Sequence, residues 1–258
     1  MSTMKGRLDK LLLDRGLTPT RERAQALILA GRVLVNEQKL EKPGSSVPND
    51  AQIRILGEDL RYVSRGGLKL ERALEHWKID LQGKFCVDVG ASTGGFTDCM
   101  LQHGADRVLA VDTGYGQIAQ SLRSDPRVAL MEKTNARKLN PGELPSGIRF
   151  LAMDVSFISA TLVLPAVIAA VAPGDEGFEA VILVKPQFEA GREHVGKGGI
   201  VRDPEAHRLA IERVRTCAGS LGAIDLEVID SPIHGAEGNA EFLLHARWGL
   251  AQPEEGNG

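Results

Sequence analysis

A glycine-rich segment, Asp88–Asp98 (DVGASTGGFTD), contains the residue types that hold a nucleoside or a nucleotide. Three of its residues permit a sharp turn and a close approach of the backbone to a ligand: Gly90, Gly94 and Gly95. A dinucleotide site needs a further glycine at position 92 to admit the pyrophosphate, and this chain has Ser92 there. Asp112 lies 22 residues beyond Gly90, where a carboxylate can accept hydrogen bonds from both hydroxyls of a ribose. The pattern therefore favours a nucleoside ligand without phosphate groups.

S-adenosylmethionine is the nucleoside that matches this pattern, and we expect it to bind at the glycine loop. The alternative interpretation is structural. In that case Gly94 and Gly95 only ease a tight turn, and Asp88 only caps a helix or a loop. The loop by itself leaves both interpretations open.

The glycine loop is part of a longer alternation of short apolar runs with helical patterns. Seven runs predict strands, at residues 85–89, 108–111, 128–131, 150–153, 180–184, 226–229 and 242–245. Strands that alternate with helices predict an α/β fold, here a doubly wound, Rossmann-like parallel sheet of seven strands. One helix is well marked from about Pro204 to Leu221, because Asp203 can cap it and a proline occupies its first position.

The N-terminal part of the chain has a different pattern. Leucines at helical spacing predict a first helix over residues 7–15. A second helix is expected from Thr18-Pro19-Thr20 to Gly31, because the hydroxyls can cap it and the proline suits a first turn. Short strands are expected at 32–36 and 51–56, with a turn at 37–39. This predicts a small α+β domain.

Charge is unevenly distributed along the chain of 258 residues. The whole chain has 31 Lys and Arg against 34 Asp and Glu, a net charge of -3. Residues 1–63 contain 11 of these cations and 8 of the anions, a net charge of +3, which leaves 20 and 26, a net charge of -6, for residues 64–258. Positive charge is densest within Lys5–Arg32. Such a patch can attract a polyanion, although a solvated helical face has the same composition.

Residues 7–56 resemble the alpha-L RNA-binding module, which several RNA-modifying enzymes share. The match is most specific from Thr20 through the AGRVLVN turn. The resemblance implies RNA binding, and the basic side chains that can reach phosphates are Arg7, Lys10, Arg21, Arg23 and Arg32. The module has no Phe or Trp on which unpaired bases could stack, which favours folded RNA recognised by its shape. The alternative is a pair of helices that only packs on the larger domain.

Four further motifs, together with the glycine loop, resemble the TlyA family: SRGGLKL (64–70), MDVSFIS (153–159), VKPQFE (184–189) and GNAEFLLH (238–245). This family, historically labelled hemolysin, joins an alpha-L module to an FtsJ-like ribosomal RNA 2'-O-methyltransferase domain. The resemblance extends to about Trp248. It implies an RNA-binding domain at 1–60, a linker at 61–65 and an S-adenosylmethionine-dependent methyltransferase domain at 66–250. The polar composition of the last residues predicts a disordered tail at 251–258.

The Lys-Asp-Lys-Glu tetrad of FtsJ-like enzymes maps in order onto Lys69, Asp154, Lys185 and Glu241. The implied reaction is an SN2 attack of a ribose 2'-oxygen on the sulfonium methyl of S-adenosyl-L-methionine, and the hydroxyl must lose its proton. A lysine that is desolvated beside a second ammonium is neutral for part of the time and can take that proton. We assign this role to Lys185, with Lys69 as its cationic neighbour. Asp154 would orient the amine and the methyl donor, and Glu241 would position Lys69 or the ribose.

Each tetrad member also has an ordinary alternative, as a solvated or capping residue. The expected donor site comprises Asp88, Gly90, Ala91, Ser92, Gly94, Gly95, Phe96, Thr97, Asp112, Asn135 and Asp154. Asn135 is included because it matches the family's position near the adenine. Phe157 and Phe188 follow two tetrad members and could stack the target base, although an apolar Phe is more often part of a core. The histidines show no ligand spacing, and no metal site is expected.

Composition limits the remaining functions. The widely spaced cysteines, Cys86, Cys99 and Cys217, argue against a disulfide framework and favour a reducing cytoplasm. No apolar segment suits membrane insertion or lysis.

Three alternative functions stay open: an RNA-binding or ribosome-assembly protein with an idle methyltransferase fold, a hemolysin, and a small-molecule methyltransferase. The expected partner is ribosomal RNA or a ribosomal subunit, and the resemblance points to cytidine as the nucleotide. The oligomeric state and the target position stay open.

Overall fold

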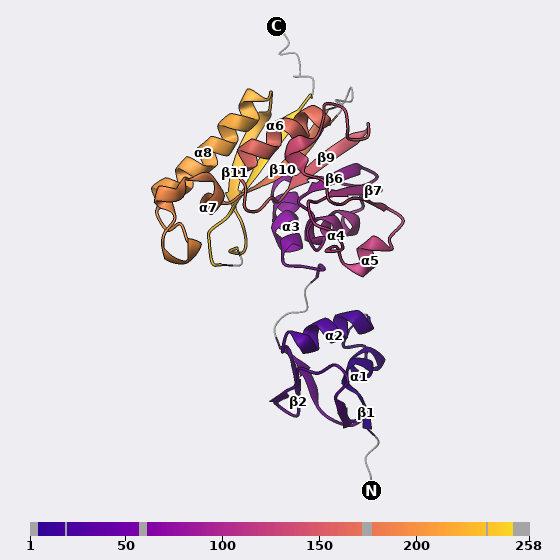
Figure 1. Ribbon diagram of the computed structural model, residues 1–258. Helices are drawn as coiled ribbons and strands as arrows, with labels where there is room; N and C mark the ends of the chain where they lie inside the picture. Colours follow the sequence, from indigo (N-terminus) through magenta and orange to yellow (C-terminus); the bar gives the residue numbers. More distant parts are fainter. Residues whose placement is uncertain (1–4, 19, 57–60, 172–176, 236, 250–258) are drawn as a thin grey trace. The chain divides into compact units, whose positions relative to one another are not determined.

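The computed structural model describes residues 5–18, 20–56, 61–171, 177–235 and 237–249 (Figure 1). Its contacts divide the chain into two units, Met1–Leu60 and Arg61–Gly258, and each is described by itself. The expected tail at 251–258 and the helix-starting proline, Pro19, lie outside the described residues.

The first unit contains the two expected helices, α1 (Leu8–Asp14) and α2 (Arg21–Leu29). Thr20 caps α2, because its Oγ1 accepts a hydrogen bond from the Arg23 N–H at 3.1 Å. The helical spacing brings Leu8, Leu12, Leu27 and Ile28 into one buried core. The strands of this unit are β1 (Lys5–Arg7), β2 (Val33–Val35), β3 (Gln38–Lys39), β4 (Ser46–Pro48) and β5 (Ile53–Ile55).

These strands form two small antiparallel sheets. One has the order β3-β2-β5, and the other is the pair β1 and β4. The pair β1–β4 was not expected from the sequence. The two strands, Lys-Gly-Arg and Ser-Val-Pro, contain only one aliphatic β-former between them, Val47, so they show no apolar pattern and only their pairing in the fold reveals them.

The second unit is built on a sheet of seven strands in the order β11-β12-β10-β9-β6-β7-β8. All seven strands include the expected apolar runs: β6 (Phe85–Val89), β7 (Arg107–Val111), β8 (Val128–Met131), β9 (Ile148–Met153), β10 (Phe178–Val184), β11 (Ile224–Asp230) and β12 (Phe242–Trp248). The expected parallel sheet is confirmed for the pairs among β6, β7, β8, β9 and β10, whereas β12 departs from it and runs antiparallel to both of its neighbours. β11 and β12 are joined by a short loop without a crossover helix, and such a connection reverses the chain.

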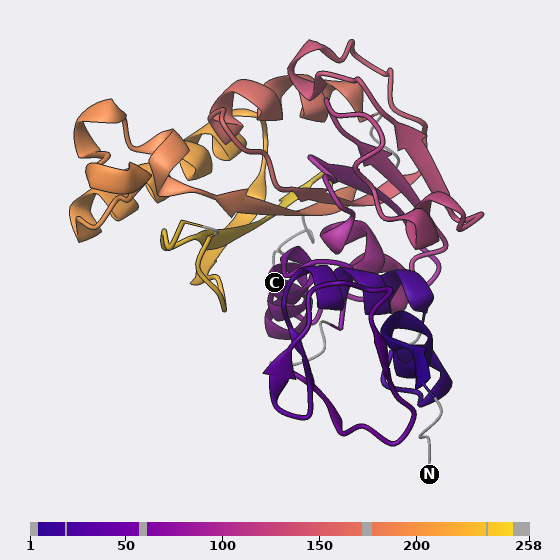
Figure 2. The same ribbon diagram turned by 60° about the horizontal axis from the view of Figure 1, so that its bottom comes forward.

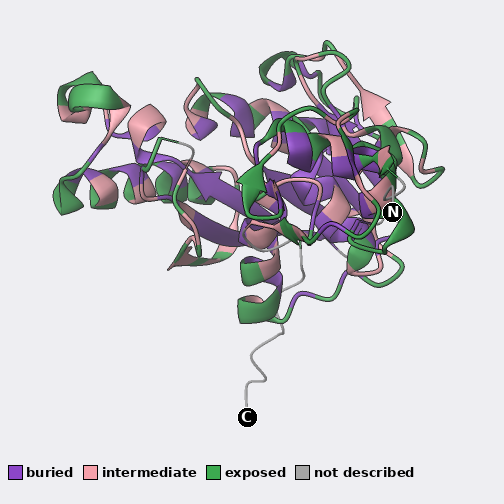
Figure 3. Ribbon diagram, turned by 90° about the horizontal axis from the view of Figure 1, so that it is seen from below, coloured by how far each residue is buried: buried purple, intermediate pink, exposed green. Residues whose placement is uncertain are grey.

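Helices cover both faces of this sheet, as expected for a doubly wound fold (Figure 2). The core on one face includes residues of α6 (Ala160–Ala170) and α8 (Pro204–Ser220). The core on the other face includes residues of α3 (Gly66–Trp77) and α4 (Gly95–Gln102), with a short α5 (Gln120–Arg123) beside them. Figure 3 shows the centre of the sheet as buried, whereas the edge strands β8 and β11 contain only intermediate and exposed residues. Asp203 caps α8 as expected, since its Oδ1 accepts from the Glu205 N–H at 3.0 Å.

The remaining helical segments of this unit are one turn long. They are α7 (Pro186–Glu189), η1 (Ala136–Lys138), η2 (Arg192–His194) and η3 (Lys197–Gly199). Residues 61–65, expected as a linker, belong to the second unit and pack within it: Tyr62 is buried, and the Val63 N–H donates to Asp98 Oδ2 at 2.7 Å. In the described parts of the chain, no helix combines the length and the apolar character needed to cross a membrane.

Candidate active site

Two adjoining cavities lie at the carboxyl ends of the parallel strands. The first, of about 450 Å³, is lined by all four tetrad residues and is called the tetrad cavity. The second, of about 550 Å³, is lined by Asp112 and Asn135 and is called the Asp112 cavity. Residues shared by both linings are Gly90, Ser92, Asp154, Ser156 and Phe157. This edge is the usual place for ligands in doubly wound sheets.

The glycine loop needs its glycines for two separate reasons. Gly90 has a φ of 87°, and a Cβ there would lie 2.3 Å from the carbonyl oxygen of Asp154. Gly94 has a φ of 95°, which a residue with a side chain rarely adopts. At Gly95 the space is the limit, because a Cβ there would lie 2.2 Å from Ser64 Oγ. Both the backbone conformation and the close packing therefore require the absence of a side chain. Ser92 also has a positive φ, 50°, which is strained for a residue other than glycine.

Asp112 at the end of β7 fixes the shape of the loop. Its Oδ2 accepts from the Ser92 N–H at 2.8 Å, and its Oδ1 accepts from the Gly114 N–H at 2.6 Å. Each carboxylate oxygen keeps a lone pair, so Asp112 can still receive the hydroxyls of a ribose. Asn135 lines the same cavity, and its Oδ1 caps η1 by accepting from the Arg137 N–H at 3.1 Å.

Asp88 is fully buried below the loop. Its Oδ2 accepts from both the N–H and the hydroxyl of Thr97, at 2.9 and 2.7 Å. Its Oδ1 is buried and has no hydrogen-bond partner among the described residues. Burial raises the pKa of this carboxyl to about 7. Nine of the eleven expected donor-site residues line one of the two cavities, and Gly94 and Thr97 do not.

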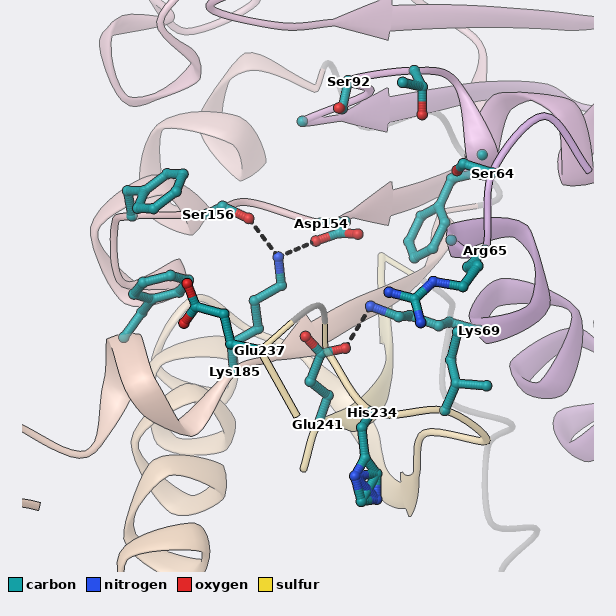
Figure 4. A pocket seen from close by; sticks show the side chains of 18 of the residues that line it. Ser64, Arg65, Lys69, Ser92, Asp154, Ser156, Lys185, His234, Glu237 and Glu241 are labelled. Carbon is teal, nitrogen blue, oxygen red and sulfur yellow. Dashed lines mark hydrogen bonds and ion pairs between the residues drawn. The ribbon is translucent and has the colours of Figure 1, made fainter. Parts of the chain in front are cut away.

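The structure brings all four tetrad residues to the tetrad cavity, as two oppositely charged pairs (Figure 4). Lys69 Nζ, on α3, donates to Glu241 Oε2 at 2.5 Å, and both side chains are buried. Lys185 Nζ, at the end of β10, lies 2.5 Å from Asp154 Oδ1 and donates to Ser156 Oγ at 2.6 Å. The Lys185–Asp154 contact is an ion pair without hydrogen-bond geometry, since Asp154 Oδ1 accepts no hydrogen bond among the described residues.

The contacts within the two pairs agree with the expected arrangement, in which Glu241 contacts Lys69 and Asp154 contacts the Lys185 amine. The role of Lys69 as the cationic neighbour of Lys185 stays a prediction. The Lys185 side chain lies against the Asp154 carboxylate. The four side chains together have a formal net charge of zero.

Several supporting residues lie inside the quoted motifs but were not identified from sequence. Ser156 contacts Lys185 directly. Glu189, buried at the end of α7, accepts from Ser159 Oγ at 2.5 Å and from the Ala160 N–H at 2.6 Å, which fixes the start of α6. Asn239 is fully buried, with its Oδ1 accepting from the Val201 N–H at 2.9 Å. The sequence did offer a signal for these three supporting residues. Each is a polar residue inside a quoted motif, two or four positions from a tetrad member.

Phe157 and Phe188 lie together on the wall of the tetrad cavity. Their ring centroids are 5.6 Å apart with an interplanar angle of 52°. Phe157 is 91% exposed and has a φ of 64°, so it is not a core residue. An exposed aromatic ring beside a cavity can stack on a planar ligand.

In the first unit, the structure brings two of the five expected RNA-binding residues together. Arg7 and Arg21 both pair with the buried carboxylate of Asp9, at 2.9 and 3.0 Å. The Arg7 guanidinium is the main cause that lowers the pKa of Asp9. Lys10 is exposed on α1, and Arg23 is partly buried on α2. Arg32 lies apart from them, and its Nε donates to the carbonyl oxygen of Leu56 at 2.8 Å.

In the described residues, no group of His, Cys, Asp and Glu side chains is arranged to hold a metal ion.

The chain matches two protein families in sequence. Residues 62–248 match the FtsJ-like methyltransferases, and residues 6–53 match the S4 domain. The fold therefore pairs a methyltransferase sheet with a small module of a known type.

Individual relatives agree with this pairing over nearly their whole length. The chain is 49% identical to "Putative rRNA methyltransferase YqxC" of Bacillus subtilis, over 99% of this chain and 92% of that protein. It is 41% identical to "16S/23S rRNA (cytidine-2'-O)-methyltransferase TlyA" of Mycobacterium tuberculosis, over 94% of this chain and 90% of that protein. The solved structure of "Putative hemolysin from Streptococcus thermophilus" superposes with a TM-score of 0.70 at 42% identity, over 99% of this chain and 93% of that one. The chain therefore belongs to the TlyA family of FtsJ-like methyltransferases, with an S4 domain at its N-terminal side.

Proposed function

We propose that this protein transfers a methyl group from S-adenosylmethionine to the 2'-hydroxyl of a cytidine in ribosomal RNA. The observation that supports this most directly is the tetrad cavity, where two lysine–carboxylate pairs line the same space as the glycine loop. The printed names of the relatives from Mycobacterium tuberculosis and Bacillus subtilis support ribosomal RNA as the substrate. Such a substrate places the reaction in the cytoplasm.

The residues of the two cavities fit the donor. Asp112 would receive the ribose hydroxyls, and Asn135 would lie near the adenine. Gly90 leaves room for a close approach to the backbone, and the unpartnered Oδ1 of Asp88 and the Asp154 carboxylate would face a positively charged amino acid group. When bound, S-adenosylmethionine supplies an electrophilic methyl group on a positively charged sulfur.

Lys185 is our candidate for the general base. In the structure its Nζ lies against Asp154 Oδ1 and donates to Ser156 Oγ. The ammonium form of Lys185 would be disfavoured by the positively charged sulfur of the bound donor in the same cavity, because like charges at short range repel. The amine of Lys185 could then take the proton of the ribose hydroxyl as the oxygen attacks.

The other pair would position the ribose. Lys69 is held by Glu241 in a cavity where its side chain could orient an oxygen of the substrate. Phe157 and Phe188 would hold the target base once it has left its stack, which an enzyme acting inside folded RNA requires. The S4 unit would bind the surrounding folded RNA through its basic residues.

The test is a transfer assay with purified small and large ribosomal subunits and a labelled methyl donor. The expected product is a 2'-O-methylcytidine, located in the RNA by nuclease digestion and mass spectrometry. Subunits incubated with Lys185→Ala serve as the control for contaminating activity. Methylation of a base, or no transfer to either subunit or to its naked RNA, would contradict the proposal.

A further inference from the structure

An exposed tyrosine and two cations lie at the rim of the Asp112 cavity, and the proposed methyl transfer does not use them. Tyr115 is 70% exposed and belongs to the loop between β7 and α5. Figure 1 labels both of these elements. Lys133 Nζ lies 4.5 Å from the centroid of its ring. Arg137 is exposed and lines the same cavity as Gly114, the residue before Tyr115. We call these three residues the Tyr115 surface.

Two loops that are far apart in sequence build this surface. The Lys133 N–H donates to the carbonyl oxygen of Gly114 at 2.9 Å, and the Thr134 N–H donates to that of Asp112 at 2.9 Å. These bonds hold the segment after β8 against the segment after β7. The tyrosine ring is therefore presented to solvent on a hydrogen-bonded support at the edge of the expected donor site.

The cations of this surface form no salt bridge among the described residues, and the charge of Lys133 is the smallest of the causes that lower the pKa of Glu132. The adjacent acid, Glu132, pairs with Arg123 at 2.5 Å and also accepts from the Gly116 N–H at 2.7 Å. Lys133 and Arg137 make no ion pair in the described structure. Residues 64–258 have a net charge of -6, so a general excess of positive charge does not explain this local surface.

An exposed aromatic ring combined with unpaired cations is suited to single-stranded nucleic acid. The ring stacks on a base, and the cations contact the flanking phosphates. We propose that the Tyr115 surface binds an unpaired nucleotide of the substrate RNA that flanks the methylated one. The first unit has no aromatic residue among residues 1–60, so this surface would add a stacking contact that the S4 unit lacks. The identity of the partner as RNA rests on the proposed function.

The test measures RNA binding by the full chain, with fluorescence anisotropy and two labelled probes: a 12-nucleotide oligocytidylate and a 12-base-pair RNA duplex. Tyr115→Leu keeps an apolar side chain but cannot stack, and it should weaken oligocytidylate binding about tenfold while duplex binding changes less than about twofold. Tyr115→Phe should bind both probes like the unmodified protein. Lys133→Glu should lower the slope of log affinity against log salt for oligocytidylate by about 0.7.

Arg208→Glu is the matched control, because Arg208 is an exposed cation on α8 that already pairs with Glu205. It should leave both affinities unchanged. Calorimetry with S-adenosylhomocysteine should show unchanged donor-site binding in Tyr115→Leu, because Tyr115 does not line either cavity.

Three results would overturn the inference: unchanged oligocytidylate affinity in Tyr115→Leu, equal losses for the two probes, or loss of S-adenosylhomocysteine binding. These readouts do not depend on methyl transfer. An unmodified protein that transfers no methyl group to ribosomal RNA would refute the proposed function separately.

Discussion

Replacing Lys185 by alanine should stop methyl transfer and leave the protein folded. The side chain ends in the tetrad cavity, where its contacts are Ser156 and Asp154. Alanine removes the amine and leaves an Asp154 carboxylate that is 22% exposed at its side chain, so water can solvate it in part. The free energy of unfolding should therefore fall by only about 1–2 kcal/mol.

The loss of activity should be much larger than the loss of stability. Positioned proton transfer is typically responsible for about 10²- to 10⁴-fold in rate, which corresponds to about 3–5 kcal/mol in the activation free energy. Lys185→Arg is the matched variant. Its guanidinium can keep the ion pair with Asp154, but it does not release its proton at any relevant pH. Arginine should therefore lose activity to the same extent as alanine.

The assay is single-turnover transfer of a labelled methyl group to ribosomal subunits at saturating protein. Calorimetry with S-adenosylhomocysteine and anisotropy with the RNA probes should show that both variants retain their binding sites. If Lys185→Arg transferred methyl groups at a rate near that of the unmodified protein, Lys185 could not be the base. Its role would then be to contribute a fixed positive charge.

Three further predictions concern buried groups of the site. Glu241→Gln leaves the Lys69 ammonium buried without its counter-charge and should lower the free energy of unfolding, measured in urea, by about 3 kcal/mol. A loss no larger than that of an exposed Glu→Gln change would contradict the buried ion pair. Gly90→Ala places a Cβ 2.3 Å from a backbone carbonyl oxygen at a φ of 87°, and it should lower the unfolding temperature far more than Gly116→Ala, which has open space. Asp88 binds its proton more tightly when folded, with a pKa of about 7 against the ordinary 3.8, so its contribution to stability is present below pH 4 and lost as the pH rises toward 7. The stability of the unmodified protein relative to Asp88→Asn should therefore fall by about 4 kcal/mol between pH 4 and 8, and a pH-independent difference would show that this carboxyl is ordinary.

The inner strands β6, β7, β9 and β10 could be predicted because they are buried on both faces and read as apolar runs. The run at 85–89 coincides with β6. The edge strand β8 is only partly buried, but its run at 128–131 is still wholly apolar. The direction of β12 could not be predicted in the same way, since an apolar run is identical in both directions. Direction depends on the connection to the preceding strand, and the loop at 231–241 has no helical pattern that would have argued for a crossover.

The members of the candidate site were identified from motifs, but their partners were not. Lys69 and Glu241 are 172 positions apart, and no local pattern indicates that they meet. Ser156 and Asn239 make short side-chain contacts that only the folded chain creates. Residue type and order can be read from sequence, whereas the choice of hydrogen-bond partner is decided by tertiary packing.

The reversal of β12 decides which end of that strand can serve the reaction. In a parallel sheet, a residue that precedes a strand lies at the edge opposite to the ligand. Because β12 runs the other way, its first residue, Phe242, pairs with Val184, the last residue of β10. Glu241 therefore emerges beside Lys185 rather than on the far side of the sheet. A shift of this one strand by two residues would preserve the inward and outward faces of the sheet, yet it would move the carboxylate about 7 Å along the strand and out of reach of Lys69.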